Sequence, residues 1–365
     1  MSVRTANRPV PVPHHSLLAA TTFEAAEQEV GAALAVARAD GDAETSTLLE
    51  TWRGLVRARR GHLAGALADL ELATTRVAGT GGATAVAAHA GLLDCHLARG
   101  DLWRAGRFVR PLERAGTVDG IPGALAHQAR GDVAGAERDH AAAWQHHLDA
   151  GRALGPLVDR PAVLPWRLGA AVAAVHLGLR KDATALIETH RVLAVADGRD
   201  SVVAAALRAQ AAISEAGARR DLLEQALLHA DPVDAPRLTS QVATDLASHL
   251  VLGRGSTERA RTLLRSAESL ARASGLRPAA ERAGRLLLLL GETPDSPPAT
   301  RADHLTALQL LLARGAAEGR TDEELAVTLL LDVDVVRREL REACRALNVR
   351  VRHRIGHALR LPAAC

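Results

Sequence analysis

A short phrase built on glycine and alanine recurs through the first three quarters of the chain. In each clear copy a glycine is followed five residues later by an alanine; these copies are Arg60-Gly61-His62-Leu63-Ala64-Gly65-Ala66, Arg99-Gly100-Asp101-Leu102-Trp103-Arg104-Ala105, Arg130-Gly131-Asp132-Val133-Ala134-Gly135-Ala136 and Gly178-Leu179-Arg180-Lys181-Asp182-Ala183. Looser copies begin at Gly217 and Gly253, which places the six glycines 39, 31, 47, 39 and 36 residues apart. A unit of this length cannot bury its apolar face alone, so the period predicts a stack of helical hairpins.

The sequence around these phrases is helical in character from about Ser16 to Leu290. Apolar residues stand three and four apart, and no stretch alternates as a half-buried strand would. Aromatic residues make up only 2% of the chain, so alanine, leucine and valine must build the core. We predict an all-α fold in which each phrase glycine ends one helix at positive φ and the alanine allows close packing in the next. The pattern resembles tetratricopeptide repeats, and a non-repetitive alanine-rich bundle is the alternative.

The order of these features predicts a helical-repeat domain followed by a small C-terminal domain. The chain has 365 residues, enough for two domains or one long array. Residues 291–304 contain three prolines and break the helical pattern, as is typical of a linker. The predicted division is a flexible tail at 1–15, the repeat domain at 16–290, the linker at 291–304 and the C-terminal domain at 305–365.

Four short helices are predicted in the C-terminal domain. The first covers residues 306–317 and stops near Gly319. The second, over 321–330, opens with Thr321 and Glu324 at the spacing of a capping box. The third is capped by the aspartate at 332 or 334 and extends to about residue 347, and the fourth follows Arg352. The inner face of the third helix, at helical spacing, is Val336, Leu340, Ala343 and Leu347.

The outer face of that third helix carries a concentrated positive charge. Arg337, Arg341 and Arg345 stand four apart and form one stripe, with Arg338 beside it. Residues 335–360 hold eight arginines against two glutamates, a net +6, whereas the whole chain has a formal charge of +3. A helix, a tight connection and a second helix with such a face can place guanidinium groups against phosphates and guanine edges in a major groove. The alternative to a DNA-binding surface is a charged helix face that is only exposed to solvent. The charge by itself would favour this alternative.

The order of residues in this tail adds a resemblance. Over about fifty residues, a series of positions matches the pattern of a known DNA-binding module without a gap. The matching residues are Leu305-Thr306, Ala317-Glu318-Gly319, Glu324-Leu325-Ala326, Leu329, Val336-Arg337, Leu340, Leu347, Val349 and Arg352. The tail thereby resembles the helix-turn-helix module of the LuxR family of transcription regulators. The resemblance implies that the helix from about Val335 to Leu347 is the recognition helix and that the helix after Arg352 helps dimerisation. The candidate DNA-binding residues are Val335, Arg337, Arg338, Arg341, Arg345 and Arg352.

The tail departs from the family pattern at several positions. The family's Arg-Glu pair in the first helix is Leu308-Gln309 here, its Thr before the central valine is Val335, and its recognition-helix His is Glu339. An acidic residue near phosphates opposes binding, and loss of the Thr removes a hydroxyl that could contact the DNA backbone. The family's glycine after the recognition helix is Asn348, which tolerates the left-handed conformation.

A second series of residues lies upstream. It comprises Val163-Leu164-Pro165-Trp166-Arg167, Gly169-Ala170-Ala171 and His176-Leu177-Gly178. This series is similar to the helical-repeat region of the large ATP-binding LuxR-type regulators, the maltose-activator-like class of actinobacteria, where such repeats precede a C-terminal reader. A P-loop needs lysine followed by Ser or Thr, but Asp182 follows the only lysine, Lys181. The nucleotide-binding module of that class, and with it any cofactor, is therefore not expected.

Signals for enzymatic chemistry are weak. His140, His146 and His147 share one predicted helix, but no His-Glu-x-x-His or Cys/His ligand spacing is present, so packed or solvated histidines are expected and no metal site is predicted. Gly79 to Gly82 is glycine-rich but does not continue as a dinucleotide fingerprint, and we interpret it as a loop. No catalytic residue is predicted, and the chain is expected not to be an enzyme.

The few cysteines and tryptophans have ordinary interpretations. Cys95 lies in an apolar run and is expected in the core, whereas Cys344 has Arg341 and Arg345 nearby, which would lower its pKa and leaves a redox role as a side hypothesis. Core packing is expected for the tryptophans, although a concave array surface could present them to a ligand; they are Trp52, Trp103, Trp144 and Trp166.

Composition and termini favour the cytoplasm as the location. The three cysteines, Cys95, Cys344 and Cys365, fit neither a disulfide framework nor a zinc site. The first residues lack the pattern of a signal peptide, and the longest aliphatic run, Leu286 to Leu290, is too short to span a bilayer. We expect no association with a membrane.

The first functional hypothesis is a transcriptional regulator. Its C-terminal helix-turn-helix would bind double-stranded promoter DNA as a homodimer, while the repeats bind a protein or small-molecule effector. The alternative is a helical-repeat interaction or ligand-binding protein whose DNA-reading module has degenerated, as Leu308, Gln309 and Glu339 suggest. A third hypothesis, a catalytic pocket in the array, lacks a convergent set of polar residues in the sequence.

Overall fold

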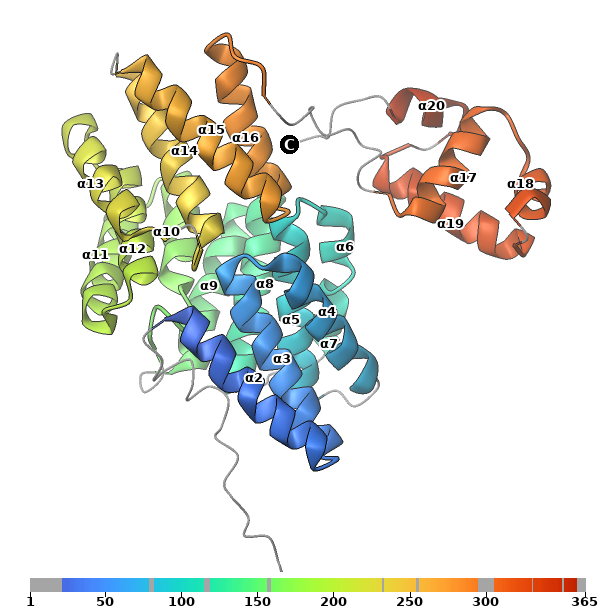
Figure 1. Ribbon diagram of the computed structural model, residues 1–365, viewed down its shortest axis with the longest axis horizontal. Coiled ribbons are helices and arrows are strands. Elements are labelled where there is room, and N and C mark those ends of the chain that lie inside the picture. Colours follow the sequence, from blue (N-terminus) through green and yellow to red (C-terminus); the bar gives the residue numbers. More distant parts are fainter. Residues whose placement is uncertain are drawn as a thin grey trace, which may run out of the picture. The chain divides into compact units, whose positions relative to one another are not determined.

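The computed structural model describes residues 22–78, 82–114, 119–155, 159–231, 233–253, 256–294, 305–329, 331–349 and 351–359. These ranges belong to two compact units, Met1–Glu292 and Thr293–Cys365. All regular structure in the described ranges is helical, which confirms the predicted all-α class (Figure 1). The predicted tail at 1–15, most of the predicted linker, the predicted loop at 79–81, Arg350, Arg360 and Cys365 lie outside the described residues.

The larger unit is an array of helices in which nearly every helix packs against the next along the chain; the exception is α7, which packs against α5 and α6 (Figure 1). Its helices are α2 (Phe23–Ala39), α3 (Ala43–Arg60), α4 (Leu63–Arg76), α5 (Ala83–Ala98), α6 (Leu102–Gly106), α7 (Val109–Arg114), α8 (Gly120–Ala136), α9 (His140–Leu154), α10 (Trp166–His176), α11 (Arg180–Asp197), α12 (Asp200–Ile213), α13 (Ala216–His229), α14 (Pro236–Leu252), α15 (Thr257–Ala273) and α16 (Arg277–Leu289). None of the helices in the described ranges is long and apolar enough to cross a membrane.

Side-chain caps and small apolar residues explain why these segments form packed helices. Five of the helices begin at a residue whose side-chain oxygen accepts a hydrogen bond from the backbone N–H three residues on, which stabilises a helix by about 1 kcal/mol; the caps are Thr22, Asp42, Asp101, Asp139 and Ser256. The core of the array is built mainly of alanine, leucine and valine, as the composition predicts.

The glycines of the recurring phrase have two different structural roles. Gly61, Gly100 and Gly178 have φ of 84°, 74° and 78° in the turns that follow α3, α5 and α10, as predicted. The prediction is wrong for Gly131 and Gly217, which lie inside α8 and α13. The turn after α8 comes seven residues beyond Gly131, at Arg138, whose φ is 66°. Gly253 ends α14 without a positive φ.

The first and last helices of the array share one core. Ala271 and Leu276 from the α15–α16 region and Ala280 from α16 belong to the same buried cluster as Val30 in α2 and Leu92 in α5. The predicted stack, in which each repeat contacts only its neighbours, does not require such contacts.

Polar contacts also join the region of α14 to the first helices of the array. Asp234, just before α14, accepts a hydrogen bond of 3.1 Å from the backbone N–H of Glu24 and lies 3.3 Å from the guanidinium of Arg60. Arg237 in α14 contacts Asp94 in α5 at 3.2 Å. The array is therefore closed on itself by contacts between residues more than 140 positions apart in the sequence.

The smaller unit consists of α17 (Ala307–Ala317), α18 (Asp322–Leu329), α19 (Val333–Ala346), the 3-10 turn η2 (Arg352–Arg354) and α20 (Ile355–Ala358). Its core takes at least one side chain from each α-helix, including Leu312, Leu325, Leu340 and Ile355. Gly315 lets α17 approach α18 closely, because a Cβ at that position would overlap the side chain of Leu325.

Candidate nucleic-acid interface

Local signals set the boundaries of the helix-turn-helix segment. Thr321 and Glu324 form the predicted capping box: each side chain accepts a hydrogen bond from the other residue's backbone N–H, at 3.2 and 2.8 Å. Asp332 caps α19, and Asn348 after its end has φ of 54°, the left-handed conformation expected of it. The predicted inner face of α19 is buried, since Val336, Leu340, Ala343 and Leu347 are at most 6% exposed.

The arginine stripe lies on the opposite face of α19. Some of its arginines form ion pairs with neighbouring acids, and others do not. Arg337 is held by Glu323 at 2.8 Å and by Asp322 and Asp334 at 3.7 and 3.6 Å. Arg338 lies 3.5 Å from Glu339.

The other two arginines of the stripe differ from these. Arg341 and Arg345 are exposed and have no ion-pair partner within the described part of the chain. Val335 is only half-exposed. Of the six candidate DNA-binding residues, these two arginines therefore keep their full hydrogen-bonding capacity for a ligand.

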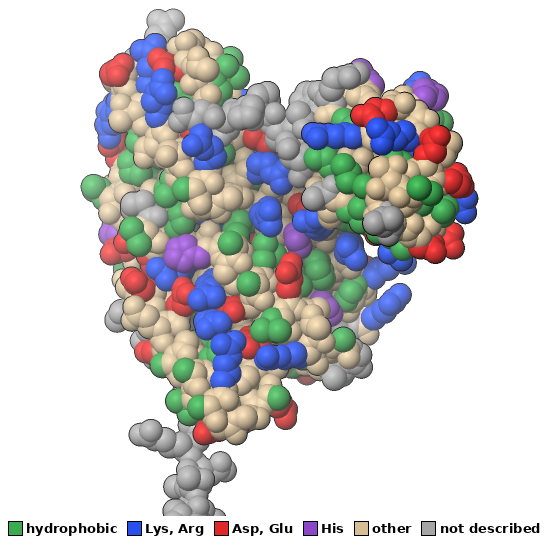
Figure 2. Space-filling model, turned by 45° about the vertical axis from the view of Figure 1, so that its right-hand side comes forward, with side chains coloured by type: hydrophobic (Ala, Val, Ile, Leu, Met, Phe, Trp, Pro, Cys, Tyr) green, Lys and Arg blue, Asp and Glu red, His purple; other side chains and the backbone are tan. Residues whose placement is uncertain are grey.

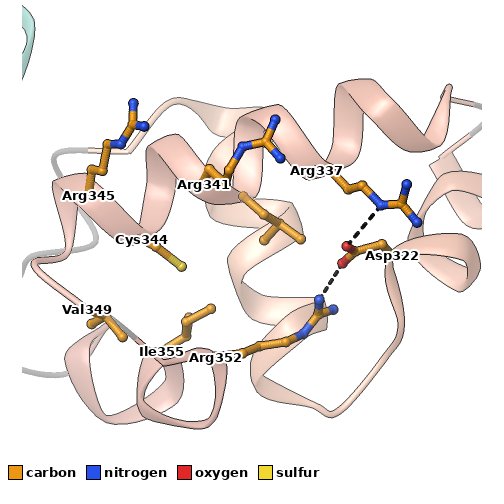
Figure 3. Close-up of a pocket in the computed structure, with 9 residues that line it drawn as sticks. Asp322, Arg337, Arg341, Cys344, Arg345, Val349, Arg352 and Ile355 are labelled. Atoms are coloured by element: carbon orange, nitrogen blue, oxygen red, sulfur yellow. Dashed lines mark hydrogen bonds and ion pairs between the residues drawn. The ribbon is translucent and has the colours of Figure 1, made fainter.

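An anion-favouring pocket of about 450 Å³ adjoins this stripe (Figure 3). Arg337, Arg341 and Arg345 from α19 and Arg352 from η2 line it together with a single acid, Asp322. Its apolar lining is Leu340, Cys344, Val349 and Ile355. Asp322 accepts from Arg352 and pairs with Arg337, which ties the start of α18 to both α19 and η2. Four guanidinium groups against one carboxylate leave the pocket with an excess of positive charge.

Two of the departures from the LuxR pattern contact each other. Gln309 in α17 is 1% exposed, and its amide nitrogen donates to Glu339 at 3.1 Å and to Glu342 at 3.3 Å. Its amide oxygen accepts from the backbone N–H of Thr306, which completes a capping box that the sequence analysis missed. Glu339 is directed toward α17 and its side chain is 18% exposed. Glu339 therefore has a tertiary contact with α17 as well as its pair with Arg338, and its effect on phosphate binding stays a prediction.

The pKa of the Cys344 thiol is shifted in the direction opposite to the one expected from the sequence. Burial raises the pKa of Cys344, and the neighbouring cation that opposes this effect is Arg352 rather than Arg341 or Arg345. The expectation of a lowered pKa is therefore wrong, because desolvation outweighs the charge. Cys95 is fully buried, as predicted, and burial raises the pKa of its thiol as well.

The histidines and tryptophans of the array lie mostly in packed positions. His140 stacks on His176 with ring centroids 4.0 Å apart, whereas His147 is buried 3.6 Å from Asp132. His140, His146 and His147 thus do not converge on one point. Trp52 is in the core at 6% exposure, as expected. Trp166 donates to Asp159 and packs against Gly151, which is also a structural role.

On the face drawn in Figure 2, basic and acidic side chains are interspersed with apolar and neutral ones.

One acid is unusual: Asp132 retains 34% of its side-chain surface, yet the surrounding protein desolvates it and raises its pKa to about 7. Asp94 contributes to this shift, while Arg237 and Arg59 oppose it.

Comparison with known proteins finds only remote likenesses. No family model matches the chain, and no curated protein matches its sequence. Among solved structures, a tetratricopeptide repeat protein from Parabacteroides merdae is 15% identical with a TM-score of 0.42, and the match covers 74% of this chain and 98% of that one. The Rap conjugation gene regulator of plasmid pLS20, solved with a Phr peptide, is 13% identical with a TM-score of 0.48 and 96% of both chains covered. RapI in its apo form is 11% identical with a TM-score of 0.42, over 96% of this chain and 98% of that one.

Proposed function

We propose that the chain is a non-enzymatic transcriptional regulator of the LuxR type, in which α18 and α19 form the helix-turn-helix that binds double-stranded DNA. The observation that carries the proposal is the exposure of Arg341 and Arg345, without an ion-pair partner among the described residues, on the outer face of a helix whose inner face is fully packed. Arginine forms bidentate hydrogen bonds with phosphates and with guanine in the major groove. The adjoining positively charged pocket supports the same proposal.

The arginines that form ion pairs have a different role from the two that do not. Arg337 and Arg352 hold α18, α19 and η2 together through Asp322, so their first effect is to orient α19. Arg341 and Arg345 then carry the largest share of phosphate contacts. In the assembled regulator, the helical array binds a protein or small-molecule effector, and a homodimer presents two copies of α19 to paired half-sites.

The test is the salt dependence of DNA binding by the full chain, measured by fluorescence anisotropy on duplexes from upstream of its own and neighbouring genes. The double variant Arg341→Ala/Arg345→Ala is expected to bind more weakly and to reduce the slope of log K against log salt by about 2, since each lost phosphate contact reduces it by roughly 1. The matched control is Arg180→Ala/Arg191→Ala, which removes two exposed arginines from α11 in the larger unit and is expected to keep the wild-type slope.

Two outcomes would contradict the proposal. One is the absence of DNA binding by the wild-type chain at low salt, which would favour the alternative of a repeat protein with a degenerated reader. The other is an equal slope for the wild type and both double variants, which would show that any binding is independent of the α19 stripe.

A further inference from the structure

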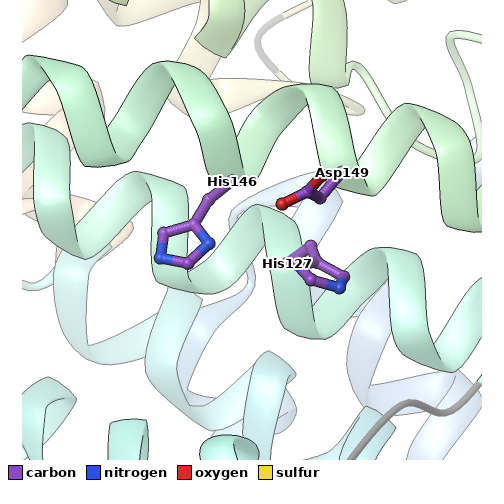
Figure 4. A group of neighbouring side chains, drawn as sticks. All are labelled: His127, His146 and Asp149. Atoms are coloured by element: carbon purple, nitrogen blue, oxygen red, sulfur yellow. The ribbon is translucent and has the colours of Figure 1, made fainter.

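Two histidines and one aspartate converge on the surface between α8 and α9 (Figure 4). His127 belongs to α8, whereas His146 and Asp149 lie three positions apart on α9 and so face the same side of that helix. Each residue can offer one ligand atom, and these three atoms lie within 4.8 Å of one another. The sequence alone did not indicate this group, because its members come from two helices that only the fold brings together.

Glycines fix the register that brings the three residues together. Gly131 of α8 faces the ring of His147, and Gly135 of α8 faces Ala143, so the two helices pack closely along their length. This antiparallel register places His127 opposite the turn of α9 that contains His146 and Asp149. The cluster therefore stands on a rigid pair of helices rather than on loops, which favours a well-defined geometry.

Each histidine of the cluster has a ring nitrogen without a partner among the described residues. Nδ1 of His127 and Nδ1 of His146 are both buried and have no hydrogen-bond partner among the described residues. Within the described ranges, the two hydrogen bonds to the Asp149 carboxylate, from Gln145 and Arg152, both go to Oδ1, which orients the group and leaves Oδ2 without a partner there. A buried polar atom without a partner is costly, and a bound metal ion removes that cost.

Protonation and neighbouring charge also bear on the site. Burial lowers the pKa of His127 and of His146. Arg130 and Arg152, which pairs with Asp149, oppose a cation at this position, while Asp149 and Asp139 favour one.

We propose that His127, His146 and Asp149 form a binding site for a divalent transition-metal ion, with Zn²⁺ the best match to two imidazole nitrogens and one carboxylate oxygen. Three protein ligands leave the fourth position of a tetrahedral ion to water. Such an ion clips α8 to α9 on the surface of the array. The site is independent of the DNA-binding proposal, since all of its residues lie in the larger unit.

The experiment titrates the full chain with Zn²⁺ after removal of metals by a chelator, using calorimetry, and repeats it with Co²⁺ to record its visible absorption. The wild type is expected to bind one equivalent and to melt at a higher temperature with zinc than without it. His127→Gln, His146→Gln and Asp149→Asn are each expected to weaken binding by more than about tenfold, as losing a direct ligand exceeds the roughly 10- to 100-fold cost of losing an outer partner.

His140→Gln is the matched control, because it removes a histidine from the same helix outside the cluster and is expected to leave the affinity unchanged. Melting in the presence of chelator shows whether the variants are folded. Absence of zinc binding by the wild type, or equal affinity in the wild type and the His127→Gln/His146→Gln double variant, would overturn the proposal.

Discussion

The imidazole of His147 shows how one side chain sets the packing of three helices. It lies between Gly131 of α8 and Gly169 of α10, and a Cβ at Gly169 would approach the ring to 2.3 Å. Burial lowers the pKa of His147 to about 4, so the ring is neutral at pH 7 and packs without a charge. The glycine of the third sequence phrase is thus required for close approach and not for a turn.

Alanine substitution at two helical glycines is expected to have opposite effects. Gly169→Ala forces the ring of His147 to move in a packed core and should lower the free energy of unfolding by about 1–3 kcal/mol. Gly31→Ala in α2 meets nothing within 4 Å and should raise it by roughly 0.5–1 kcal/mol, because alanine favours helix over the unfolded chain. Urea unfolding followed by circular dichroism measures both. A stabilising Gly169→Ala would show that His147 relaxes at no cost.

At the scale of elements, α18 and α19 show what the sequence could and could not predict. The helix boundaries came from signals within a few residues, such as the Thr321–Glu324 capping box and the left-handed Asn348. The contacts of Gln309 with Glu339 and of Arg352 with Asp322 each join residues thirty positions apart. No local pattern specifies such pairs, so the sequence could predict the charged stripe but not which of its arginines are already paired.

Release of the paired arginines is expected to strengthen the proposed DNA binding. Asp322→Asn removes the carboxylate charge that pairs with Arg352 and one of the three acids around Arg337, so the pocket gains positive charge and the salt slope of DNA binding should become steeper. The same change should lower the stability of the smaller unit by about 1 kcal/mol, since an acid is lost from the first turn of α18.

Glu318→Gln is the control for this effect. It removes one negative charge from an exposed pair with Arg320 in the same unit, outside the pocket. Fluorescence anisotropy at several salt concentrations compares the two variants. Equal slopes for Asp322→Asn and Glu318→Gln would mean that Arg337 and Arg352 serve only to hold the helices together.

At the scale of the whole larger unit, closure of the array changes how it should unfold. In an open stack of repeats, stability is a sum of contacts between neighbours, and a local defect loosens only adjacent repeats. Here α2 and α16 contribute to one core, and two ion pairs join the region of α14 to α3 and α5, which the period of the glycine phrase could not predict. A defect near the last helices should therefore be felt at the first ones.

Leu276→Ala tests this coupling. Leu276 lies between α15 and α16 and is 1% exposed in the cluster that contains Val30 and Leu92, so its truncation should cost about 2–5 kcal/mol. Hydrogen exchange is expected to accelerate in α2 to α5 as well as in α15 and α16. Leu287→Ala is the matched control, because Leu287 is equally buried in α16 but belongs to a cluster formed by helices α12 to α16. Its effect should stay within those helices at a similar loss of stability. If Leu276→Ala leaves exchange in α2 to α5 unchanged, the shared core does not couple the ends, and the array behaves as an open stack despite its closing contacts.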